Sequence, residues 1–256
     1  MRHSFIDQYS GLDSFVHRLD PRTKLIASLA VILAILLTPS GSWKVFAAYL
    51  LILLGLVWLA RLPFRYVLKR SLIIFPFVLM IAIFIPFFKE GNEIWSWDVW
   101  AWHIGLTYEG LTALVNVMIK AWLSILCLIV LTSSSKFADL LQGMYRLKVP
   151  LIFVQIISFM YRYIFVLTDQ AMRMQMARDS RNFGGNRRII FKTMGSMIGM
   201  LFIRSYERGE RIYAAMLSRG YTGELPAKST LRLKLPDACF AGMLLILLVC
   251  PAILWW

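Results

Sequence analysis

The chain has 256 residues, of which 59% are apolar and only 16% are charged, and its formal net charge is +14. A soluble globular domain carries about 45–50% apolar and about 25% charged residues, so the composition excludes an ordinary soluble domain. The apolar residues fall in long runs, as in helices that cross a membrane, where each backbone polar group must be bonded within the segment. The sequence therefore predicts an all-α, polytopic membrane protein.

Five apolar runs are predicted to span the membrane. The 24 residues before them are polar, and no small-residue cleavage pattern follows, so no cleavable signal peptide is expected. A Thr-Pro-Ser-Gly-Ser turn cluster ends the first run, and Pro76 should kink the third because proline has no backbone N–H group. The predicted spans are Leu25–Leu37, Trp43–Ala60, Ser71–Phe88, Leu111–Leu131 and Ala238–Trp256.

A basic region, residues 132–236, separates an N-terminal membrane domain, residues 1–131, from a C-terminal transmembrane helix, residues 237–256. Two of its stretches, 151–167 and 189–203, are apolar. If they crossed the membrane as a hairpin, five arginines between them would lie outside, against the usual enrichment of basic residues on the cytoplasmic side. We interpret both stretches as amphipathic helices in or under the inner interface, or as shallow re-entrant helices. The five arginines are Arg173, Arg178, Arg181, Arg187 and Arg188.

Charge and tryptophan placement predict the same topology. With the N-terminus inside, 25 of the 28 Lys and Arg residues fall on the cytoplasmic side. This asymmetry explains the net charge without a nucleic-acid partner. The sequence therefore predicts a multi-pass protein of the cell (inner) membrane. Seven of nine tryptophans lie at the predicted outer interface, which indole rings favour: Trp43, Trp95, Trp97, Trp100, Trp102, Trp255 and Trp256.

Two matching frames, Ala-x-x-Ser-Arg-(Asn/Gly)-aromatic, occur at 177–183 and 215–221 in the basic region. Each is predicted to end a helix, roughly 168–181 and 204–219, because Asn and Gly tolerate the left-handed conformation. Ala, Ser and Arg at this spacing share one helix face, where small residues admit a partner and arginine offers a fork for a carboxylate. Alternatively, the arginines only complement helix dipoles. The candidate contact residues are Ser180, Arg181, Asn182, Ser218, Arg219 and Gly220.

Polar residues are rare within the predicted spans. Lys120 lies near the middle of the fourth span, one turn from Asn116, and an intramembrane charge is a candidate functional site. Snorkelling or a structural pairing is the plainer interpretation.

No catalytic, metal or cofactor site is predicted. The histidines have no ligand spacing, the three cysteines are interpreted as small buried apolar residues, and no Walker P-loop, G-x-S-x-G or H-E-x-x-H motif occurs. We therefore expect a chain that is not itself an enzyme.

Several segments resemble the transmembrane (T) components of energy-coupling factor (ECF) transporters, and the layout is most similar to the cobalt-type CbiQ family. They are His17–Leu25, Gly105–Leu111, Leu147–Pro150 and the two arginine frames. The first frame departs from the commoner Ala-Arg-Gly form, with Ser180 and Asn182, and Lys120 stands where the family usually has arginine. The resemblance implies a coupling subunit that binds two cytoplasmic ATPases through the arginine frames and a substrate-capture subunit in the bilayer.

Two other classes of function fit the sequence less well. A self-contained channel or secondary transporter needs several intramembrane polar groups or an inverted repeat, and only Lys120 and Asn116 qualify. A membrane enzyme needs a polar cluster near one interface, and none is visible. Cobalt as the substrate rests on the resemblance alone, and nickel or a vitamin remains open.

Overall fold

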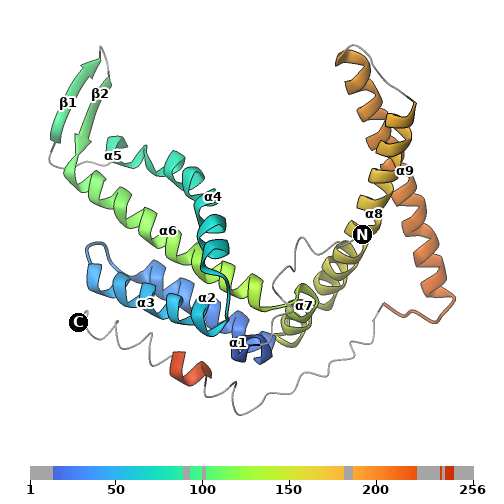
Figure 1. Cartoon of the computed structure of the whole chain (residues 1–256), viewed down its shortest axis with the longest axis horizontal. Coiled ribbons are helices and arrows are strands. Elements are labelled where there is room, and N and C mark those ends of the chain that lie inside the picture. The colour runs from blue at the N-terminus through green and yellow to red at the C-terminus, as the bar shows by residue number, and fades with distance from the viewer. Residues whose placement is uncertain are drawn as a thin grey trace. The chain divides into compact units, whose positions relative to one another are not determined.

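A computed structural model describes residues 14–88, 93–99, 102–181, 187–223, 237 and 240–244 (Figure 1). These residues are helical, as predicted, apart from one short antiparallel hairpin. The hairpin falls where aromatic and β-branched residues, which favour strands, are frequent. In chain order the elements are α1 (Phe15–Arg18), α2 (Pro21–Leu37), α3 (Trp43–Leu59), α4 (Phe64–Ala82), α5 (Ile85–Phe88), β1 (Glu93–Val99), β2 (Trp102–Thr107), α6 (Tyr108–Ser134), α7 (Phe137–Arg146), α8 (Leu151–Ser180) and α9 (Arg187–Leu217).

The chain forms two compact units, and each is described by itself. The membrane unit comprises residues 2–143 and 230–256, and the helix-pair unit comprises residues 144–229 with Met1. The predicted basic region, 132–236, contains the whole of residues 144–229.

Helix α6 lies at the centre of the membrane unit, where it packs against α2, α3, α4 and α5 (Figure 1). The core that they enclose is aliphatic and aromatic, and the described C-terminal residue Leu244 belongs to it. The most deeply buried large side chains are Ile35, Leu53, Val67 and Leu123.

Three predicted spans each correspond to one helix, namely α2, α3 and α6. The third predicted span is shared between α4 and α5, and Figure 1 shows α4, which contains Pro76, changing direction along its length. The last predicted span, 238–256, lies mostly outside the described residues.

Two helices of the described part of the chain, α6 and α8, are long and apolar enough to cross a membrane. Helix α3 is apolar but has only 17 residues. The stretches 151–167 and 189–203, predicted as separate helices, are instead the first halves of α8 and α9. The helices predicted to begin near residues 168 and 204 therefore begin earlier. No proline or glycine interrupts α8, and α9 contains its glycines without a break.

Gly110 allows the start of α6 to approach α5 closely. A Cβ atom at this position would lie 2.6 Å from the Cα atom of Pro86. The same backbone accepts a hydrogen bond at its carbonyl from the Thr107 hydroxyl, at 3.2 Å. Because the obstacle is backbone and is held in place, a side chain at residue 110 can be accommodated only by moving α5.

We expect Gly110→Ala to destabilise the protein by about 1–3 kcal/mol through overpacking. The matched control is Gly55→Ala, also within an apolar helix, where no atom lies within 4 Å of the added Cβ. This change should be neutral or stabilising by about 0.5–1 kcal/mol. Thermal unfolding in detergent measures both variants, and equal melting temperatures would contradict the close approach.

Candidate coupling site

Helices α8 and α9 form an antiparallel pair. The side-chain nitrogen of Gln155, in the first turns of α8, donates to the Gly223 carbonyl at 3.2 Å. The Tyr221 hydroxyl donates to the side-chain oxygen of Gln155 at 3.3 Å. The segment after α9 is therefore bound to the beginning of α8. Since α9 starts six residues after Arg181, the two helix ends that carry the arginine frames lie at opposite ends of the pair.

The two frames have the same local hydrogen bonds. The Ser180 and Ser218 hydroxyls donate to the carbonyls of Ala177 and Ala215, each at 3.0 Å. The backbone N–H of the arginine that follows donates to the carbonyl three residues earlier, at 3.1 Å in both frames. The repeat in the sequence is thus a repeat in conformation.

The end of α9 has the conformation that the sequence predicts. Gly220 adopts a φ of +79°, in the left-handed region. The N–H groups of Gly220 and Tyr221 donate to the carbonyls of Leu217 and Met216, at 3.0 Å each. These two bonds define a Schellman motif. In the first frame, Asn182 and Phe183 lie outside the described residues.

The arginine is the free polar group of each frame. Arg181 and Arg219 are exposed, and neither guanidinium has an ion-pair or hydrogen-bond partner within the described ranges. Both serine hydroxyls bond their own helix, and Asp179 pairs with Arg178 at 2.8 Å. From Gln155 to Ser180 a helix rises about 37 Å, which sets the approximate separation of the two arginines. Each site can bind a carboxylate independently.

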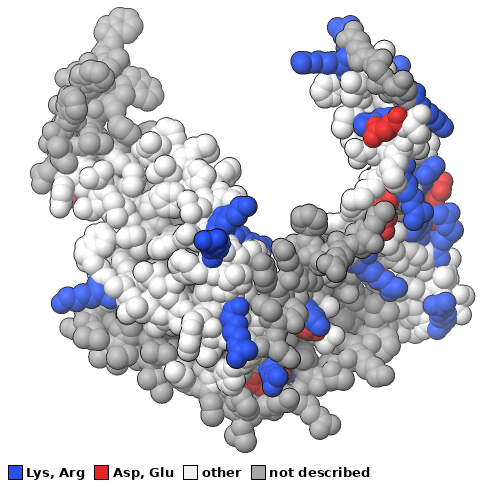
Figure 2. All heavy atoms as spheres, in the orientation of Figure 1, with Lys and Arg blue, Asp and Glu red and all other residues white. Residues whose placement is uncertain are grey.

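Basic side chains gather on the helix pair. Figure 2 shows Lys and Arg side chains along α8 and α9, with few acidic ones among them. Residues 144–223 contain thirteen Lys and Arg but four Asp and Glu.

Lys120 and Asn116 bind the backbone where α2 ends. The Lys120 ammonium donates to the Leu36 carbonyl at 2.9 Å, and the Asn116 side-chain oxygen accepts from the Gly41 N–H at 3.4 Å. The Asn116 amide nitrogen also donates to the Thr112 carbonyl, at 2.7 Å. Their polar atoms are therefore used within the fold.

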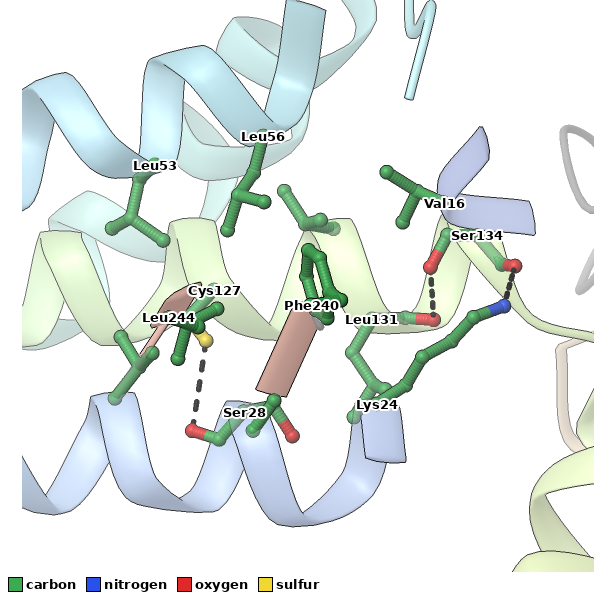
Figure 3. Close-up of a pocket in the computed structure, with 13 residues that line it drawn as sticks. Val16, Lys24, Ser28, Leu53, Leu56, Cys127, Leu131, Ser134, Phe240 and Leu244 are labelled. Atoms are coloured by element: carbon green, nitrogen blue, oxygen red, sulfur yellow. Dashed lines mark hydrogen bonds between the residues drawn. The ribbon is translucent and has the colours of Figure 1, made fainter. Parts of the chain in front are cut away.

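A second lysine, Lys24, makes the reciprocal contact at the other end of the same helices. Its ammonium donates to the Ser134 carbonyl at 2.9 Å, in the last turn of α6 (Figure 3). It also donates to the His17 carbonyl at 3.1 Å. Figure 3 also shows the small apolar cavity, of about 40 Å³, beside which this lysine lies. In the sequence, Lys24 lies within the segment His17–Leu25 that resembles a family motif, but no pattern there predicts its contact.

Carboxylates surround this junction. Asp20 caps the start of α2 by accepting from the Arg22 N–H at 3.0 Å, and its own N–H donates to the Asp237 carboxylate at 2.8 Å. Lys24 precedes the predicted first span and is only 6% exposed. Burial lowers the pKa of Lys24 to about 8, and the charges of Asp139, Asp237 and Asp20 oppose this shift.

The length and apolar composition of α6 and α8 are consistent with a helical membrane protein. Within the described residues, no group of three or more His, Cys, Asp or Glu side chains is placed to hold a metal ion.

Comparisons with known proteins give the family. The CbiQ family, described as cobalt transport protein, matches residues 13–230. The energy-coupling factor transporter transmembrane protein EcfT of Clostridium kluyveri is 30% identical, over 98% of this chain and 97% of its own length. The EcfT of Listeria innocua is 26% identical, over 100% of this chain and 98% of its own length. An uncharacterized protein of Methanocaldococcus jannaschii is 26% identical, over 92% of this chain and 81% of its own length. The chain therefore belongs to the CbiQ family of transmembrane components of energy-coupling factor transporters.

The junction around Lys24 should make stability depend on pH. The pKa of about 8 in the folded chain lies below the value of about 10.4 for a free lysine, so the unfolded chain binds more protons between these values. The stability of the wild type relative to Lys24→Met is expected to rise by about 2–3 kcal/mol between pH 8 and pH 10. Thermal unfolding of both proteins over this range measures the difference. A difference that is flat or falls with pH contradicts the assignment.

Proposed function

We propose that this chain is the coupling subunit of an energy-coupling factor importer. It links ATP hydrolysis in two cytoplasmic ATPase subunits to uptake by a membrane substrate-capture subunit, and the substrate is cobalt. The observation that carries the proposal is the pair of free arginines in matching conformations at opposite ends of α8 and α9. The relatives named as EcfT support the transporter assignment, and the CbiQ family description supports cobalt.

Two separated and equivalent sites fit two copies of one partner. Each arginine would bind a carboxylate in a groove of one ATPase subunit. Since the helices are continuous for 30 and 31 residues, movement of the ATPases relative to each other would be transmitted along their length. Exposed apolar residues on both helices, among them Ile156, Met160, Ile198 and Phe202, would contact the capture subunit or lipid.

The membrane unit favours a coupling role over a channel. A channel or secondary transporter needs polar side chains that are free to bind its substrate. Lys120 and Asn116, the charged and the amide side chains within the fourth predicted span, both bind backbone groups. We assign them a structural role in holding the end of α2.

We further propose five spans, with the helix pair on the cytoplasmic side of the cell membrane. Helix α8 is long and apolar enough to cross, but Arg162 lies near its middle and Arg178 and Arg181 at its end. If α8 crossed the membrane, Arg162 would be buried in lipid, and Arg178 and Arg181 would lie outside. This would oppose the usual enrichment of basic residues on the cytoplasmic side.

Removing either coupling arginine should weaken ATPase association. When one member of a charge-assisted pair that is desolvated on assembly is removed, the binding free energy falls by about 2–5 kcal/mol. Much of this loss arises because the carboxylate is left buried and unpaired. Arg181→Ala and Arg219→Ala should therefore reduce ATPase copurification and cobalt uptake while membrane insertion stays normal. Lysine at either position should rescue only in part, because it lacks the bidentate fork.

Arg187→Ala is the control, since Arg187 is also exposed but lies outside the frames. If the arginines only complement helix dipoles, each alanine change costs about 0.3–1 kcal/mol of stability and lysine substitutes fully. Equal and mild effects at residues 181, 187 and 219 would refute the coupling assignment. The identity of the substrate is tested separately, by measuring whether nickel competes with cobalt for uptake when the capture subunit is present.

The topology is tested by cysteine labelling. In a background without native cysteines, single cysteines at Ser180 and Ser96 should react with an impermeant reagent from opposite sides of the membrane. Ser180 should label only in inverted vesicles, because five arginines surround it in the sequence. Labelling of both positions from outside would show that α8 crosses.

A further inference from the structure

An aromatic cavity of about 400 Å³ lies between α8 and α9. The volume is within the range of small-molecule sites, about 300–1,000 Å³. The rings of Phe159 and Tyr163 stack on the α8 side with centroids 6.5 Å apart, and Tyr213 on the α9 side is 57% exposed, so the cavity is open along one edge. The wall is completed by Leu167, Ile212, Met216 and Tyr221.

Arg208 is the cationic residue of this wall. It is partly buried, and the described ranges contain no ion-pair or hydrogen-bond partner for its guanidinium. Arg211, one turn further on, lies 3.8 Å from the Glu207 carboxylate and does not line the cavity. A partly desolvated charge is unfavourable unless an opposite charge compensates it. The cavity therefore combines a surface for hydrocarbon with one unpaired positive charge.

We propose that this cavity binds one anionic phospholipid of the inner leaflet, with part of an acyl chain against the aromatic wall and the phosphate on Arg208. Basic pockets between helices on the cytoplasmic side of a membrane are suited to anionic lipid headgroups. The excess of Lys and Arg over Asp and Glu on this unit attracts such lipids (Figure 2). A free phosphate or nucleotide would leave the apolar wall uncovered. The site goes beyond the proposed function and does not require ATPase binding, and its place in the inner leaflet rests on the proposed topology.

Gly209 provides a way to fill the cavity without removing a contact. It lines the cavity, and no atom lies within 4 Å of a Cβ built on it. Leucine at this position should occupy space that the lipid needs, and it favours the helix over glycine. Gly199 is equally open on the same helix but does not line the cavity, so Gly199→Leu is the matched control.

Native mass spectrometry of the full chain in mild detergent, with phosphatidylglycerol or phosphatidylcholine added, tests the site. The wild type should retain one phosphatidylglycerol and little phosphatidylcholine. Arg208→Gln should weaken retention about fivefold, and Gly209→Leu should abolish it. Arg211→Gln and Gly199→Leu should retain the lipid as the wild type does, and ATPase copurification should be normal in Arg208→Gln.

Three results would overturn the proposal. Equal retention of the two lipids would show that the charge of Arg208 does not select the ligand. Equal losses in Arg208→Gln and Arg211→Gln would show general attraction to the basic surface. Loss of ATPase copurification in Arg208→Gln with lipid retained would make the cavity a protein-binding site. Because the coupling arginines are unchanged in these variants, failure here leaves the coupling proposal intact.

Discussion

The membrane unit depends on a reciprocal contact between two antiparallel helices. Lys24 at the start of α2 binds the last carbonyl of α6, and Lys120 in α6 binds a carbonyl in the last turn of α2. The final carbonyls of a helix have no partner within it, and leaving a buried carbonyl unsatisfied is costly. Each lysine therefore satisfies one carbonyl at the end of the opposite helix, at two points about 20 Å apart. This arrangement fixes α6, on which α3, α4 and α5 pack, and it fixes the residue from which the chain leaves toward α7.

The helix pair is built on a different principle. Its arginine ends are alike in conformation although their sequences differ at Asp179 and Leu217, because each serine hydroxyl and each arginine N–H bonds the backbone three residues earlier. The side-chain hydroxyl is used locally, so the guanidinium of each frame remains without a partner among the described residues. Few of the pair's side chains are buried, in contrast to the membrane unit. The membrane unit thus uses the charges of Lys24 and Lys120 within its own fold, whereas Arg181 and Arg219 of the helix pair make no such contact in the described part of the chain.

The features that follow from local chemistry could be predicted from sequence. Hydropathy located α2, α3 and α6, and the left-handed tolerance of glycine located the end of α9 at Gly220. Features that depend on distant contacts could not be predicted. The bond from Lys24 to Ser134 joins residues 110 positions apart, and the bond from Asp20 to Asp237 joins residues 217 apart. The sequence does not predict the hairpin before α6, because its tryptophans also fit the role of interfacial anchors. Nor does it predict the continuity of α8, because the change from apolar to polar composition near residue 167 resembles the boundary of a helix.

Helix α9 has no buried residue along its described length of 31 residues. A newly made chain without its partners exposes that surface, with Phe191 and Phe202 each more than 70% accessible. Exposed apolar surface of this kind favours aggregation and recognition by chaperones and proteases. If the proposed partners cover α9, their supply would limit how much of this chain persists in a cell, and overproduction of the chain alone would raise its turnover more than the number of complexes.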